Sequence, residues 1–244
     1  MEQKIQELGP ENVAAFIAEP VQASLGLIIP PSSYFPEIQR ICERYDVLLI
    51  SDEVVTGLGK TGKMFGFQSF DFQPDLFTLA KGLSSGYFPI SCVAIGVKVG
   101  DLFRRTDRTF VHGFTNCGHP VGAAVALENI AVIEDEGLIE KVHDDTGPYL
   151  AGRLKEFLDF PFVGEVTSIG IIGAIEIDIT KVKPHEFANY DADGLKASSF
   201  VPPVKWDTFP QWIQRGTGSN EKATERARPS LAWQGSNAAR AEQK

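Results

Sequence analysis

A chain of 244 residues with 43% hydrophobic and 23% charged residues has the composition of a globular protein and is long enough for one large core or two domains. Its formal net charge of −9 argues against nucleic acid or an anionic membrane as a partner. The apolar runs are too short and too often broken by charge to span a membrane, which takes about 20 apolar residues.

The N-terminus and the cysteines bear on location. The first residues, MEQKIQELGPEN, are polar and lack the apolar stretch of a signal peptide. Cys42, Cys92 and Cys117 are odd in number and have no CxxC spacing, which favours a reducing compartment over a disulfide framework or a zinc site. We therefore predict a cytoplasmic location, with mitochondria as the alternative.

Strand-like and helix-like segments alternate over residues 1–140. Apolar runs predict strands at 13–21, 47–51, 74–82 and 90–97. The run VLLIS at 47–51 shows no polar alternation, which is typical of a strand covered on both faces. A helix over 36–47, with Pro36 at its start, places Ile38, Ile41, Cys42 and Tyr45 on one face. This alternation predicts an α/β fold with a mostly parallel sheet flanked by helices.

The C-terminal half predicts further elements. A helix rich in small residues is expected over 119–136. Amphipathic helices follow at 136–145 and 147–158, interrupted at Gly147-Pro148, and two strands surround a glycine turn within 163–179. We predict part of a large domain at 1–137, the start of a small α+β domain at 138–180, and a divergent, disordered or loosely attached tail at 181–244.

Three polar side chains follow predicted strands. Glu19, Asp52 and Lys81 each come after an apolar run, and open parallel sheets bind ligands beyond the carboxyl ends of their strands. Taken singly, each has a structural interpretation, because such an Asp is most often a turn or N-cap residue and such a Lys a solvated helix end. Asp52 and Lys81 also have the option of pairing with each other. The set of three at one edge favours a functional site.

The segment VLLISDEVVTGLGKTG, residues 47–62, has features of a nucleotide-binding site, with acids after a strand and then Gly-Lys-Thr. A phosphate-binding loop requires GxxxxGK[ST], and here Val54 occupies the position of the first glycine. The end of a single strand would also have to supply both the acids that bind a metal ion and the loop that binds phosphate. We therefore exclude this interpretation and expect Lys60 and Thr61 to be loop residues. His112 and His119 have no third ligand nearby, so no metal site is expected.

Over residues 1–178 the sequence resembles the class III, fold type I aminotransferases, which use pyridoxal 5'-phosphate. The matching segments are AAFIAEPVQ, YFPEIQRICERYDVLLISDEVVTG, GKTGKMFGFQSFDFQPDLFTLAKGLSSGYFPIS, HGFTNCGHP and VGEVTSIGIIGAIEI. The DEV and AKGLSSG boxes are the most specific of these. The form GFQSFDFQPD with SSGYFPIS is most similar to the ω-amino acid or amine:pyruvate subgroup.

The resemblance implies roles for individual residues. Lys81 would carry the cofactor as a Schiff base and then act as the base that moves a proton. Asp52 would pair with the pyridine nitrogen, and Val54 would pack on the ring. Thr115 resembles the residue that binds the cofactor phosphate from the neighbouring subunit of a homodimer.

Other positions carry weaker implications. Glu19 and Gln22 lie on the substrate side or support the cofactor, whereas Glu53 tends to be structural in the family. The implied reaction transfers an amino group from a small amine or ω-amino acid to a keto acid such as pyruvate. An aminomutase, a decarboxylase relative and a catalytically inactive remnant are the alternatives.

Parts of the family pattern have no counterpart. The Gly-Ser turn that holds the phosphate and the aromatic residue that stacks on the ring are not found in the sequence. The resemblance is expected to stop near Asp178, where the substrate-carboxylate Arg cannot be placed. We therefore expect the chain to correspond to a piece of the family's fold with an unrelated C-terminal stretch.

Overall fold

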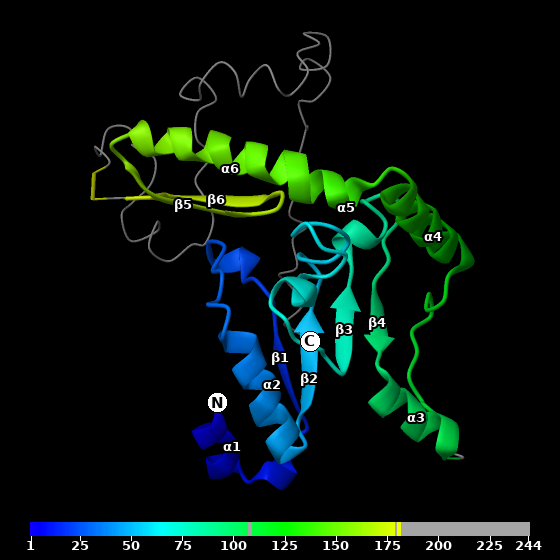
Figure 1. The fold of residues 1–244 in the computed structure, drawn as a ribbon. Coiled ribbons are helices and arrows are strands. Elements are labelled where there is room, and N and C mark those ends of the chain that lie inside the picture. Colours follow the sequence, from blue (N-terminus) through cyan, green and yellow to red (C-terminus); the bar gives the residue numbers. More distant parts are fainter. Residues whose placement is uncertain (107–108, 179, 182–244) are drawn as a thin grey trace, which may run out of the picture. The chain divides into compact units, whose positions relative to one another are not determined.

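The computed structural model describes residues 1–106, 109–178 and 180–181 (Figure 1). Most of the predicted tail, from residue 182 to residue 244, lies outside the described residues. The helices are α1 (Glu2–Leu8), α2 (Tyr34–Tyr45), α3 (Val97–Arg105), α4 (Pro120–Asp135), α5 (Leu138–Lys141) and α6 (Gly147–Lys155). The strands are β1 (Ala15–Ala18), β2 (Leu48–Asp52), β3 (Leu76–Leu79), β4 (Cys92–Ile95), β5 (Val163–Ile169) and β6 (Ile172–Ile177).

The first four strands form one sheet in the order β1-β2-β3-β4. β1, β2 and β3 run parallel, whereas β4 is antiparallel to β3, and Figure 1 shows its arrowhead pointing opposite to those of β2 and β3. This confirms the predicted mostly parallel α/β sheet. Parallel pairing follows from the crossover through α2, which returns the chain to the starting end of the sheet before β2 begins.

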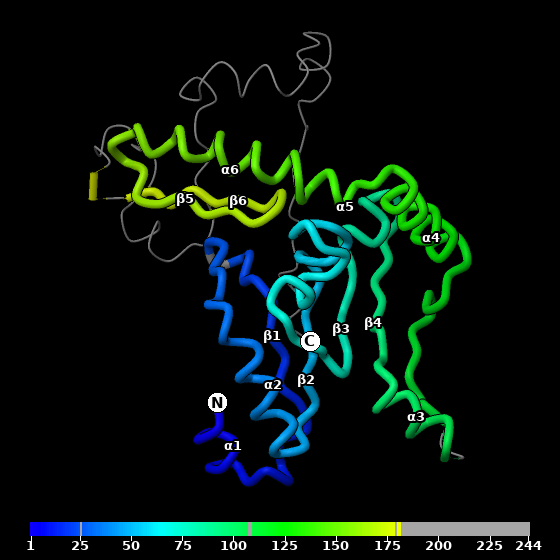
Figure 2. The backbone as a smooth tube through the Cα atoms, viewed as in Figure 1, coloured from blue at the N-terminus to red at the C-terminus, as the bar shows by residue number. Residues whose placement is uncertain are grey.

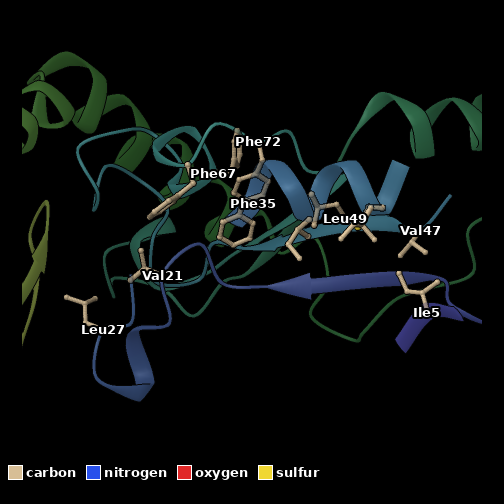
Figure 3. Packing of buried hydrophobic residues seen from close by; sticks show 12 residues of the cluster. Ile5, Val21, Leu27, Phe35, Val47, Leu49, Phe67 and Phe72 are labelled. Carbon is tan, nitrogen blue, oxygen red and sulfur yellow. The ribbon is translucent and has the colours of Figure 1, made fainter. Parts of the chain in front are cut away.

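Helix α2 covers one face of the sheet. It begins at Tyr34 rather than at Pro36, and it buries Phe35, Ile38, Ile41 and Cys42. These side chains pack with Val47 and Leu49 in the larger core cluster (Figure 3). The Phe35 ring stacks on that of Phe72 with centroids 4.2 Å apart. Burial of each such side chain stabilises the fold by about 1.5–3 kcal/mol, so the amphipathic face of α2 fixes the helix on the sheet.

The opposite face of the sheet is apolar but remains partly exposed within the described residues. On this face, one residue from each of the strands β1 to β4 pairs with the next across the sheet: Ile17, Ile50, Leu76 and Ile95. Ile17 is 56% exposed and Ile95 49%, whereas the two central residues of the row are half-buried. The expectation that β2 is covered on both faces is therefore wrong for the part of the chain that the structure describes.

The region from Leu138 continues as a long helical stretch followed by a hairpin. A π-helical turn (Val142–Thr146) joins α5 to α6, and Gly147 keeps helical angles, with φ −65° and ψ −54°. The predicted interruption at Gly147-Pro148 is therefore wrong. Proline lacks an N–H and clashes with the carbonyl of the preceding turn in a regular α-helix, and the wider π turn accommodates it. None of the described helices has the length and apolar character needed to cross a membrane.

Strands β5 and β6 form the predicted hairpin, which lies along α6 (Figure 2). The glycine turn of this hairpin contacts the loop that contains Lys60. Ile171 donates its N–H to the Lys60 carbonyl oxygen at 3.0 Å, and a Cβ on Gly170, whose φ is +54°, would collide with that oxygen. Thr61 is buried, with its hydroxyl 3.1 Å from that of Ser69. The GLGKTG segment is thus a packed loop, as expected.

Candidate active site

The three polar residues singled out in the sequence lie at one edge of the sheet. Glu19 directly follows β1, Asp52 ends β2, and Lys81 follows β3. The strands are in register there, because Ala18 is opposite Ser51 and Asp52 is opposite Thr78. The carboxyl ends of the parallel strands therefore deliver two acids and one amine to the same edge.

Asp52 is half-buried and is fixed through one of its two carboxylate oxygens. Its Oδ1 accepts hydrogen bonds from the Val54 N–H and from the Thr78 hydroxyl, each at 3.1 Å. Its Oδ2 makes no hydrogen bond or ion pair with any residue that the structure describes. Such an oxygen remains available to a donor that is not part of these residues.

Thr78 was missed by the sequence reasoning. Its side chain reaches Asp52 because the two residues are direct neighbours across the parallel strands. The available signal was the hydroxyl inside the apolar run LFTLA, at the register position of the acid. A hydroxyl at that place both orients the carboxylate and saturates one of its oxygens.

Lys81 opens a short 3-10 helix (Lys81–Leu83), and its side chain is exposed. Its backbone has φ 25°, a value that non-glycine residues rarely adopt. Among residues 1–106, 109–178 and 180–181, nothing forms an ion pair or hydrogen bond with its amine. In particular, Lys81 and Asp52 do not pair with each other, so the structural ion pair considered from the sequence is wrong.

Glu53, next to Asp52, has the opposite environment. It is 1% exposed, and its carboxylate accepts hydrogen bonds from four donors. These are the hydroxyls of Ser51 and Thr56 and the backbone N–H groups of Gly66 and Phe67, at 2.6–3.0 Å. Glu53 therefore ties the end of β2 to the start of the following 3-10 helix (Gly66–Ser69), and this agrees with the structural role expected for it.

Glu19 and Gln22 lie in the segment after β1. The half-buried Glu19 accepts a hydrogen bond from the Ala23 N–H at 3.4 Å. Gln22 is exposed, and its backbone pairs with that of Ile28 in an isolated antiparallel bridge. Both residues therefore lie in the segment that follows β1, and these contacts do not indicate a ligand for either side chain.

The segment before α4 contains the other predicted residue, Thr115, which lies exposed in a turn. His119 is the N-cap of α4, where its Nδ1 accepts a hydrogen bond from the Val121 N–H at 3.3 Å. The described residues include no cluster of His, Cys, Asp and Glu side chains that is suited to a metal ion. His119 is therefore accounted for by helix capping.

The amine of Lys81 and the carboxylate of Asp52 fit pyridoxal phosphate. An accessible primary amine is the group that bonds to an aldehyde carbon. A half-buried carboxylate with one saturated and one available oxygen suits a protonated ring nitrogen, since a carboxylate beside a cation favours the charged form of both groups. The residues Lys81 and Asp52 are thus of the chemical types that this cofactor requires.

Comparison with known proteins identifies the family. The family model for "Aminotransferase class-III" matches residues 1–213, so the similarity does not stop near Asp178 as expected. The putrescine–pyruvate aminotransferase of Pseudomonas aeruginosa is 47% identical over 189 residues, which are 78% of this chain and 41% of that protein. A gamma aminobutyrate transaminase of Solanum lycopersicum, named chloroplastic, is 42% identical over 74% of this chain and 35% of its own length.

Solved structures give the same result for the fold. An (S)-enantioselective omega-transaminase from Thermomicrobium roseum is 41% identical, with a TM-score of 0.70 over 76% of this chain and 42% of that one. The omega transaminase from Pseudomonas jessenii, solved in complex with PMP, is 45% identical, with a TM-score of 0.69 over 74% of this chain and 41% of that one.

The chain spans about two fifths of the length of the first curated relatives it matches. Over that span, the family model, the sequence identities and the fold agree with one another. The chain therefore belongs to the class III aminotransferases, the pyridoxal-phosphate-dependent family that its DEV and AKGLSSG boxes indicate.

Proposed function

We propose that this protein transfers an amino group from a small primary amine or ω-amino acid to a keto acid such as pyruvate. The observation that carries the proposal is a pair of groups at one sheet edge, the Lys81 amine and Asp52 Oδ2. They do not pair with each other and have no partner among the residues that the structure describes. The names of the relatives support the substrate class, because they specify putrescine, pyruvate and gamma-aminobutyrate.

Lys81 is the proposed attachment and proton-transfer residue. Its Nζ would hold pyridoxal phosphate by bonding to the aldehyde carbon, with loss of water. Once a substrate amine has displaced it, the free Nζ would serve as the base that takes up and returns the transferred proton. A lysine amine suits both roles because, once deprotonated, it is both a nucleophile and a base.

Asp52 is the proposed partner of the ring nitrogen. Pyridoxal phosphate, when bound, supplies a ring that accepts electrons from the substrate carbon. Asp52 Oδ2 would pair with the protonated ring nitrogen, while Oδ1 accepts hydrogen bonds from the Val54 N–H and the Thr78 hydroxyl. In this arrangement, one oxygen orients the carboxylate and the other would be available to the ring nitrogen.

The remaining residues support the site in this proposal. Val54 would pack against the cofactor ring, and Glu19 and Gln22 would lie on the substrate side or support the cofactor. In a homodimer, Thr115 would bind the phosphate of the cofactor held by the neighbouring subunit. We also propose that the helices and hairpin from Leu138 begin a small second domain.

The proposal is tested by following alanine. The full chain is mixed with pyridoxal phosphate, pyruvate and one amine at a time, either putrescine or 4-aminobutyrate. We expect alanine to form with the wild type and not with Lys81→Ala. The control is the exposed Lys63→Ala, which should behave as the wild type. Cofactor attached to Lys81 without any alanine from this panel would overturn the proposed transfer reaction while leaving the cofactor site in place.

A further inference from the structure

Asn129, on α4, holds the turn that follows Lys81. Its Nδ2 donates to the carbonyl oxygens of Gly82 at 2.8 Å and Leu83 at 3.2 Å, and its Oδ1 accepts from the Ser85 hydroxyl at 2.6 Å. The side-chain amide has one favourable orientation here, because the reverse would set its oxygen against two carbonyl oxygens. One side chain thus joins α4 to a segment 44–47 residues away in sequence.

The turn itself is strained. Lys81 has φ 25° and Ser85 φ 48°, both in the left-handed region where a side chain is unfavourable. The 3-10 helix has a single turn, so its last carbonyls have no partner within it. Such a backbone persists only where the surrounding structure determines it, and Asn129 supplies the partners that these carbonyls lack.

Apolar packing places Asn129 for this role. Leu83 is buried in a cluster with Ala126 and Ile133 of α4. Residues 126, 129 and 133 are spaced as one face of a helix, so the face that buries Leu83 also brings the Asn129 amide to the turn. The apolar contact fixes where α4 lies, and the amide fixes the path of the turn.

We propose that Asn129 is the positioning residue for Lys81: by holding Gly82, Leu83 and Ser85, it fixes the strained backbone from which the Lys81 amine reaches the cofactor. The inference rests on the proposed function, because it gives Lys81 the attachment role. It assigns Asn129 no contact with cofactor or substrate.

The first test measures where the cofactor attaches. The full chain is treated with pyridoxal phosphate and borohydride, and peptide mass spectrometry gives the ratio of label on Lys81 to label on the exposed Lys63. We expect this ratio to fall about tenfold in Asn129→Ala, the size of effect that losing hydrogen bonds to a strained turn produces. In Asn129→Asp the ratio should fall at least as far, because this variant places a carboxylate against the carbonyl oxygens of Gly82 and Leu83.

The matched control is Glu128→Ala, which removes an exposed side chain from the neighbouring position of α4 and should leave the ratio unchanged. An Asn129→Ala variant that stays folded, judged by its melting temperature, and keeps the wild-type ratio would overturn the inference. Ser85→Ala provides a milder change, with an expected fall of about two- to threefold from the loss of one hydrogen bond.

A second readout needs no cofactor. Hydrogen exchange of the backbone amides at residues 82–87 should be about tenfold faster in Asn129→Ala, since local opening no longer breaks the bonds from Asn129. Unchanged exchange in a folded variant would contradict the inference. Failure of the proposed function appears instead in the wild type, either as an absence of cofactor on Lys81 or as attached cofactor that yields no alanine, so the two failures are distinguishable.

Discussion

The two adjacent acids at the end of β2 have opposite environments. Asp52 lies at an open edge of the sheet, whereas Glu53 lies in a closed hydrogen-bond network. Glu53 is buried and its carboxylate is saturated by four donors. Asp52 is half-buried, and only one of its oxygens has partners within the described residues. A carboxylate that serves stability has its acceptors filled, whereas one that serves a ligand keeps an acceptor in reserve.

The largest expected effect is a loss of stability when the hydrogen-bond network of Glu53 is removed. Glu53→Ala should lower the free energy of unfolding by about 3–5 kcal/mol, because it leaves several buried donors without an acceptor. Urea unfolding of the apo chain measures this loss. Glu128→Ala, on an exposed face of α4, is the control and should change stability by less than about 0.5 kcal/mol. A loss below about 1 kcal/mol for Glu53→Ala would show that the network contributes little.

The second prediction concerns the open edge, where the acid Asp52 is replaced by the amide of the same shape. Asp52→Asn keeps an oxygen for Val54 N–H and the Thr78 hydroxyl, so stability should change by less than about 1 kcal/mol. Cofactor affinity should fall about 10- to 100-fold, or about 1.4–2.7 kcal/mol, because the charge opposite the ring nitrogen is lost.

Absorbance titration with pyridoxal phosphate measures the affinity of this variant, and Glu53→Gln is its counterpart. The amide at position 53 should lower stability more than the amide at position 52 does. If the two substitutions affected stability and cofactor affinity in the same proportion, the contrast between the regions would be lost.

The third prediction concerns pH and the buried side of the sheet. Burial, with help from the nearby Asp75 and Glu43 carboxylates, raises the pKa of the Cys42 thiol from 9.0 to about 11. The folded state therefore holds this proton more tightly, so the stabilisation is complete below pH 9 and is lost as the pH rises toward 11. Between pH 7 and 10 the wild type should lose on the order of 1 kcal/mol of stability through this group alone.

The matched variant is Cys42→Ala, which lacks the thiol but retains every other group that titrates in this range. Unfolding measured in urea at several pH values should give a shallower decline for the variant than for the wild type. Parallel declines would contradict the assignment of this pH dependence to Cys42.

The smallest expected effect comes from removing the hydroxyl that orients Asp52 at the open edge. Thr78→Val preserves shape and removes the hydroxyl that donates to Asp52 Oδ1. Stability should fall by about 0.5–1.5 kcal/mol, and cofactor affinity should fall about two- to fivefold because the carboxylate is less well oriented. The same titration and unfolding experiments measure both. A larger loss of affinity than Asp52→Asn gives would assign Thr78 a direct contact with the cofactor instead.

Most of the sheet and its edge was predictable from sequence. Apolar runs predicted the strands, the periodicity of 36–47 predicted α2, and the rule that ligands bind beyond parallel strand ends brought Asp52 and Lys81 together. These features depend on local pattern and on the handedness of crossovers, both of which a single sequence carries.

The features that were missed depend on contacts between distant segments. Thr78 and Asn129 act through side chains that tertiary packing brings to Asp52 and to the turn after Lys81. The continuous helix through Pro148 depends on a π turn that a local rule for proline does not anticipate. The exposed sheet face likewise depends on which segments pack there, and the apolar run alone predicted full burial.

The central claim, that the edge at Asp52 and Lys81 is a pyridoxal phosphate site, is tested most directly by locating the cofactor on the chain. The full chain is incubated with pyridoxal phosphate, reduced with borohydride and mapped by peptide mass spectrometry. We predict one modified peptide, containing Lys81, that disappears in Lys81→Arg and weakens in Asp52→Asn. Label spread over Lys60, Lys63 and Lys98, and unaltered by either substitution, would contradict the account.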